Sequence, residues 1–172
     1  SSNDLSERLD FYSNNPLFKG VRHILQAEKK GFMLQDSFLK GIDQLKDFNL
    51  TYDILIYPHQ LQEATTLVEK NPKQAFVLDH LAKPYIKDQK IKRWASDIKQ
   101  LAKNKNVFCK VSGIITEADW NHWQAKDFEK YLSVALEAFG SDRLMFGSDW
   151  PVCLLAGSYQ HVVKIIDLFI EE

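Results

Sequence analysis

Polar side chains stand at the ends of the short apolar runs of this sequence. These ends are Tyr57-Pro58-His59, Asp79-His80, Lys110-Val111-Ser112 and Ser148-Asp149. Taken singly, a strand-end Asp or Ser often serves only as the N-cap of the next helix, and a lone His often packs in the core. Taken together at one edge of one sheet, these titrating and hydrogen-bonding groups indicate a chemical site.

The elements that would position these groups alternate between two periodicities. Apolar or β-branched runs at 20–25, 52–57, 75–80, 107–113 and 143–149 predict strands, and segments of helical period at 37–48, 60–70, 91–104, 128–140 and 159–172 predict helices. Five βα units indicate a parallel sheet covered by helices. In such sheets the chemistry lies at the carboxyl ends of the strands.

Two architectures fit this α/β pattern. An open doubly wound sheet normally carries a glycine-rich phosphate turn, and the sequence has no G-x-G-x-x-G. A TIM-type barrel needs no such turn, but it needs eight strands and about 250 residues. The pattern therefore leaves open a smaller open sheet or the C-terminal part of a barrel whose first units are missing.

Composition narrows the class of protein. The 172 residues suit one domain, residues 1–172, and 22 Lys and Arg against 23 Asp and Glu give a net charge of -1, which argues against nucleic acid as a partner. Two cysteines are too few for a disulfide framework and favour a reducing compartment, here the cytoplasm. No apolar run approaches the roughly 18 residues of a membrane span, so we expect no membrane partner.

Several motifs together resemble one family. They are GVRHILQ (20–26), YPHQL (57–61), VLDHLAKP (77–84), KVSGIITEADW (110–120) and RLMFGSDWPVC (143–153). In this order and spacing they resemble the amidohydrolase superfamily, in particular its branch of sugar-acid lactonases. The resemblance implies a TIM-type (β/α)8 barrel, of which this chain supplies about strands 4 to 8 and lacks the N-terminal units.

The resemblance also implies roles for residues of this chain. It implies a hydrolase of carbohydrate metabolism that opens a sugar-acid lactone or similar cyclic ester, with Asp149 as the base that activates water and His80 polarising the carbonyl. Lys83 would bind a carboxylate or hydroxyl of the small-molecule substrate, and Trp150 would offer its ring to the sugar. The remaining expected substrate-binding residues are Arg22, His59 and Lys110.

Strand alternation refines two of these expectations. Arg22 and His23 are neighbours in a predicted strand, so only one can face the barrel interior, and we expect Arg22 to do so. By the same argument Asp79, next to an inward-facing His80, is expected to hydrogen-bond the outer layer.

The requirement for a cofactor stays open at this point. The resembled superfamily includes members that bind divalent ions such as zinc or manganese. If this chain binds one, the resemblance implies His80 and Asp149 as its ligands. We assign no metal and no other cofactor. The family's first-strand H-x-H motif is absent from these residues. Two alternatives follow: a metal-dependent amidohydrolase or non-oxidative decarboxylase, and an inactive partial barrel that only binds ligand or partners.

Five strands cannot close a barrel built for eight. We therefore expect unpaired edges at the first and last strands and an uncovered inward face that exposes Phe76, Leu78 and Met145. An unpaired edge strand can pair with a strand of another chain, so we expect this chain to form a homo-oligomer.

Overall fold

The computed structural model describes residues 2–171 and contains one five-stranded parallel sheet. Its strands are β1 (Gly20–Ile24), β2 (Thr51–Leu55), β3 (Phe76–Leu78), β4 (Val107–Val111) and β5 (Leu144–Phe146), hydrogen-bonded in sequence order. The order of pairing is that of consecutive βα units of a barrel, and no strand is inserted between them.

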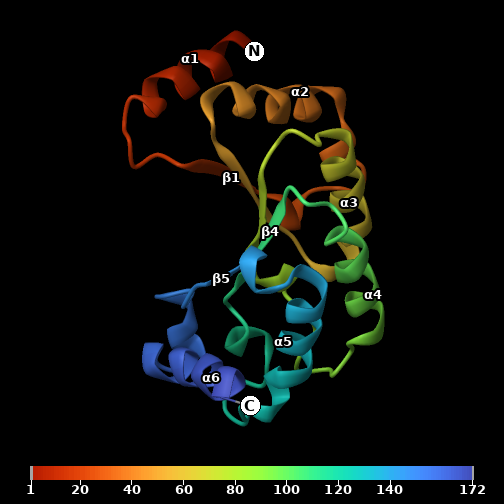
Figure 1. The fold of residues 1–172 in the computed structure, drawn as a ribbon, viewed down its shortest axis with the longest axis vertical. Helices are drawn as coiled ribbons and strands as arrows, with labels where there is room; N and C mark the ends of the chain where they lie inside the picture. The colour runs from red at the N-terminus through yellow and green to blue at the C-terminus, as the bar shows by residue number, and fades with distance from the viewer. Residues whose placement is uncertain (1, 172) are drawn as a thin grey trace.

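Six α-helices accompany the sheet. They are α1 (Ser2–Ser13), α2 (Asp36–Leu45), α3 (Leu61–Lys70), α4 (Lys92–Leu101), α5 (Lys126–Phe139) and α6 (Tyr159–Glu171). Figure 1 shows α3, α4 and α5 along one side of the strands, with α1 and α2 at one end of the molecule and α6 at the other. Because parallel crossovers are right-handed and the strands follow one another in order, the connecting helices α2 to α5 cover the same face of the sheet. Helix α3 packs against α4, and α4 against α5. Among residues 2–171, none of the helices has the length and apolarity that crossing a bilayer requires.

The hydrophobic core lies between the sheet and these helices. Alternate strand residues such as Ile54, Phe76, Leu78 and Cys109 point into it and are fully buried. The expectation that Phe76 and Leu78 lie on an uncovered face is therefore wrong, because their phase in β3 directs both toward the helices. Met145 does lie on the uncovered side and is 36% exposed.

The face of the sheet opposite the helices, called here the open face, carries polar and charged side chains instead. It is bounded by β1 and β5, which are the two edge strands as predicted. Ile24 at the end of β1 and Phe146 at the end of β5 are 58% and 49% exposed. Apolar residues therefore lie at both edges of the sheet.

The unpaired edges of β1 and β5 lead to a first prediction, for residues 1–172 expressed alone. We expect oligomers or aggregates with essentially no lactonase activity, because unpaired strands and exposed apolar side chains associate. Light scattering on the purified chain measures the first property, and a pH-stat lactone assay the second. Phe146→Lys should shift the population toward monomer, whereas Ser96→Lys, at an exposed position of α4, should not. A monodisperse, active monomer would show that the open edges do not matter.

Candidate active site

The turn that follows β3 has an unusual backbone. His80, Leu81, Ala82 and Lys83 all adopt left-handed conformations, with φ between 52° and 56°. None is glycine, and each such residue costs roughly 1 kcal/mol. The turn is closed by the Lys83 amide, which donates to the His80 carbonyl at 2.7 Å, and the buried Trp94 indole donates to the Leu81 carbonyl at 2.8 Å. Strain that surrounding contacts maintain in this way is typical of functional sites.

This turn brings His80 to the ends of the next two strands. The His80 Nδ1 lies 2.7 Å from the Ser112 hydroxyl, which follows β4, and its Nε2 lies 3.7 Å from Oδ1 of Asp149, which follows β5. Gly113 permits this approach: a Cβ there would lie 3.0 Å from both Asp149 Oδ2 and His80 Nδ1. The structure thus unites His80 and Asp149, the two predicted catalytic residues, and adds Ser112, which sequence reasoning noted only as a strand end.

The contacts of His80 indicate its protonation. Burial lowers the pKa of His80 below its ordinary value of 6.5; Asp149 and Asp79 raise it, and Lys83 and Lys110 lower it. The neutral ring has one N–H, and that proton is stabilised on Nε2, which faces the Asp149 carboxylate. Ser112 then donates its hydroxyl proton to Nδ1. His80 is thereby held as a neutral hydrogen-bond donor at Nε2.

A second prediction concerns pH. Because the pKa of His80 in the folded protein lies below 6.5, the neutral donor persists through neutral pH and is lost only as pH falls below that value. We expect kcat/KM for lactone hydrolysis to be flat from about pH 7.5 to 6.5 and to decline below it. In His80→Asn the residual activity should lack that decline. A wild-type profile that declines from above pH 7 would contradict a neutral His80.

Four charged side chains form a connected group on the open face, here called the ladder: Arg22, Asp53, Asp79 and Lys110. Asp79 has a fully buried carboxylate that Arg22 contacts at 3.0 Å and Lys110 at 2.5 Å, and Lys110 also reaches Asp53 at 3.3 Å. Arg22 faces this side as expected. The expectation that Asp79 joins the outer layer is wrong: its carboxylate is held by two cations of the open face.

Lys83 is already paired in the structure. Its Nζ lies 2.5 Å from Oε1 of Glu117, and both side chains are less than one-fifth exposed. Glu117 was missed by sequence reasoning because it belongs to the loop after β4, 34 residues away. A ligand that contacts Lys83 would therefore also meet the carboxylate of Glu117.

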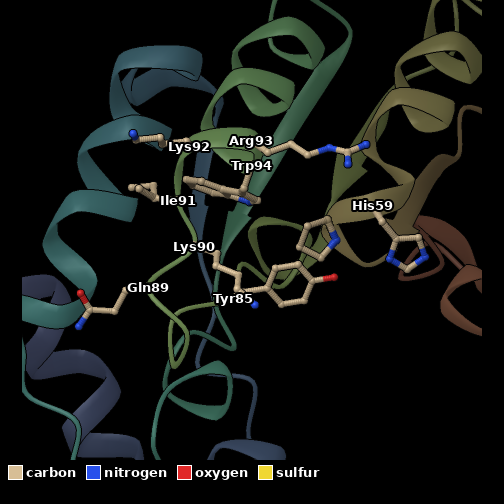
Figure 2. Close-up of a pocket in the computed structure, with 9 residues that line it drawn as sticks. His59, Tyr85, Gln89, Lys90, Ile91, Lys92, Arg93 and Trp94 are labelled. Atoms are coloured by element: carbon tan, nitrogen blue, oxygen red, sulfur yellow. The ribbon is translucent and has the colours of Figure 1, made fainter.

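His59 lies in a different place from His80. It lines a pocket of about 610 Å³ with Tyr85, Arg93 and Trp94, between the start of α4 and the connection that leads to α3. Figure 2 shows the His59 and Tyr85 rings on one side of the group of lining residues, with the Arg93 side chain extending above them. The structure thus does not bring His59 to the His80–Asp149 pair.

Trp150 adjoins Asp149 in the chain and is 65% exposed.

The described residues offer an incomplete set of metal ligands. His80 Nε2 and Asp149 Oδ1 are two donor atoms of suitable chemistry, but catalytic zinc usually takes three protein ligands and a water. Within residues 2–171, no group of three or more His, Cys, Asp or Glu side chains is placed to hold a metal ion. These residues alone do not fit a catalytic metal.

The parallel sheet of consecutive βα units forms part of a (β/α) barrel, and an imidazole and a carboxylate meet at the carboxyl ends of its strands. A family model described as amidohydrolase matches residues 3–172, and the chain belongs to this family.

Named relatives agree with this assignment. The chain is 38% identical to an L-fucono-1,5-lactonase of Burkholderia multivorans, over 97% of this chain and 60% of that protein. It is 33% identical to an L-fucono-1,5-lactonase of Burkholderia ambifaria, over 92% of this chain and 54% of the relative. The chain therefore spans somewhat more than half the length of these curated relatives.

A solved structure supports the fold. The crystal structure of an amidohydrolase from Burkholderia multivorans with bound zinc superposes with a TM-score of 0.92 at 36% identity, over 97% of this chain and 61% of that chain. This match confirms the expected portion of a TIM-type barrel.

Proposed function

We propose that the complete protein carrying this chain hydrolyses a sugar-acid lactone, with L-fucono-1,5-lactone as the first substrate to test. The observation that carries the proposal is the meeting of neutral His80 with Asp149 at the ends of β3 and β5. The similarity to two L-fucono-1,5-lactonases supports the choice of substrate.

In the proposed reaction Asp149 acts as the general base. A water hydrogen-bonded to its carboxylate attacks the lactone carbonyl carbon, and the carboxylate accepts the water proton as the new C–O bond forms. A carboxylate is a weak base, but a lactone is a better electrophile than an amide, so modest assistance suffices. Asp149 is 15% exposed, which leaves it reachable from the open side.

His80 supplies the complementary group. Its Nε2–H donates to the lactone carbonyl oxygen and stabilises the negative charge that develops there, as an oxyanion-hole donor does. When the intermediate collapses, the bond between the carbonyl carbon and the ring oxygen breaks. The ring oxygen takes the proton from Asp149, and the product is an open-chain hydroxy acid, which ionises.

Lys83 and Trp150 are proposed to bind the sugar. The Lys83–Glu117 pair provides a donor and an acceptor side by side for ring hydroxyls. The exposed Trp150 ring provides an apolar face next to Asp149. His59 has no part in this proposal, because it lines the separate pocket.

The alternative of a metal-dependent reaction has one observation in its favour, the zinc in the similar Burkholderia multivorans structure. His80 and Asp149 would be this chain's ligands to such an ion, and when bound it would lower the pKa of a bound water. The remaining ligands would have to come from outside residues 2–171.

One experiment separates these functions. The complete protein is purified gently, its zinc and manganese are measured, and it is assayed against L-fucono-1,5-lactone, a cyclic amide of the same ring size and an aromatic carboxylate. Saturable hydrolysis of the lactone alone, retained after chelation, supports the lactonase. Stoichiometric metal with loss of activity on chelation supports the metal-dependent alternative, and release of carbon dioxide the decarboxylase.

A further inference from the structure

Every cation near the site on the open face already has a carboxylate partner. Arg22 and Lys110 contact Asp79, Lys110 also contacts Asp53, and Lys83 contacts Glu117. With Asp149 and neutral His80 added, the group holds three cations and four carboxylates. The charge of each of these three cations is therefore already compensated by a carboxylate, and an anionic ligand would meet no excess of positive charge.

The ladder lies close beneath the catalytic pair. Lys110 and Ser112 are two residues apart and share one side of the chain at the end of β4, and Ser112 contacts His80. Asp79 directly precedes His80 in the chain. The ladder and the imidazole are thus joined both along the chain, through Asp79, and through the contact of Ser112 with His80.

The exposure of the ladder makes part of it available to a ligand. Arg22 is 46% exposed at its side chain, and Lys110 and Asp53 are each 26% exposed, whereas Asp79 is fully buried. Asp79 therefore fixes the two cations from below, and Asp53, Arg22 and Lys110 present their free hydrogen-bonding capacity to the open side. Alternating donors and acceptors of this kind suit hydroxyl groups, which donate and accept at once.

We propose that this charge-compensated ladder, with Asp53 as its specificity-determining residue and Asp79 as a positioning residue, selects an uncharged, hydroxyl-rich lactone ring and rejects lactones that bear a carboxylate. The inference rests on the proposed lactonase function and adds to it the charge of the accepted substrate. An extra carboxylate on the ring would meet paired cations and the carboxylates of Asp53 and Asp149, and like charges brought together are costly.

The same arrangement favours release of product. Hydrolysis converts a neutral lactone into a carboxylate, so the product carries a charge that the substrate lacks. In a site with more carboxylates than cations, that product is repelled. The open-chain acid should therefore inhibit weakly.

Asp53→Asn tests the proposal in the complete protein. Asp53 is the partly exposed acid of the ladder, so its replacement removes one negative charge while leaving the Asp79 contacts that hold Arg22 and Lys110. The matched control is Asp43→Asn, because Asp43 pairs with Lys46 on the exposed surface of α2. Both variants are compared with wild type by circular dichroism and thermal melting before assay.

The readout is the ratio of kcat/KM for L-fucono-1,5-lactone to kcat/KM for a sugar-diacid monolactone, which carries a free carboxylate. We expect wild type and Asp43→Asn to favour the neutral lactone strongly, and Asp53→Asn to reduce the ratio by about 10-fold or more, with tighter inhibition by the fuconate product.

Two results would overturn the proposal. The first is equal use of both lactones by wild type. The second is an unchanged ratio in Asp53→Asn, which includes an equal loss on both substrates and marks a purely structural role. Failure of wild type to hydrolyse either lactone would instead overturn the proposed function, and the inference with it.

Discussion

Asp149→Asn lowers kcat for lactone hydrolysis by at least about 100-fold in the complete protein while leaving the fold intact, if Asp149 is the general base. The amide keeps the shape of the side chain but cannot accept the water proton. KM should change little, because the ring hydroxyls are bound elsewhere. A pH-stat assay of purified wild type and variant measures the effect, and matching circular dichroism spectra exclude misfolding.

The control for this variant is Asp142→Asn. Asp142 is an exposed acid just before β5, seven residues from Asp149 and hydrogen-bonded only locally to Ser141. Its amide variant should keep wild-type turnover. Near-normal kcat in Asp149→Asn would remove Asp149 from the role of base.

His80→Asn should reduce kcat by a comparable factor of about 100. The shorter amide does not reach the position of Nε2, so the developing oxyanion loses its donor, whereas the amide oxygen can still accept from the Ser112 hydroxyl near the position of Nδ1. Lys83→Ala should act differently and mainly raise KM, because Lys83 is proposed to bind hydroxyls and to take no part in proton transfer. Initial rates over a range of lactone concentrations separate the two effects.

His122→Asn is the matched control for the histidine variant. Its side chain is 82% exposed and contacts Asp119 in the loop after β4, away from the His80–Asp149 pair. We expect wild-type kinetics from it. A His80→Asn enzyme with unaltered kcat, beside an unaltered His122→Asn enzyme, would exclude His80 as the carbonyl-polarising group.

Much of the fold could be predicted from the sequence because its signals are local. Apolar runs and helical periodicity predicted all five strands and five of the six helices, and the parallel order follows from their alternation. Helix α1 was missed because its sequence, SNDLSERLDFYS, has a weak apolar pattern with only Leu9 fully in the core. The strands are also shorter than predicted, since β3 ends at Leu78 and the turn that carries His80 begins there.

The orientation of Asp79 could not be predicted by alternation. In a strand that continued through these residues, the side chains of Asp79 and His80 would point to opposite faces of the sheet. The strand instead ends, and the left-handed turn at φ 52° redirects His80, so that both side chains reach the open face. A run of four left-handed residues without glycine has no signature in the sequence.

The partners of the site residues were equally inaccessible. Ser112 with His80 and Glu117 with Lys83 are contacts between residues 32 and 34 positions apart, made only when neighbouring strands pair. Sequence reasoning could place polar residues at one edge of the sheet, but it could not say which of them are neutralised by a neighbour. That difference separates a site for anions from the charge-compensated site proposed above.

The most direct test of the account is the initial rate of L-fucono-1,5-lactone hydrolysis by the complete, chelator-treated protein, followed by acid release in a pH-stat at pH 6.5, where spontaneous hydrolysis is slow. We expect saturable turnover by wild type that falls about 100-fold in both Asp149→Asn and His80→Asn. A wild-type rate no higher than the buffer blank, or equal rates in all three proteins, would contradict it.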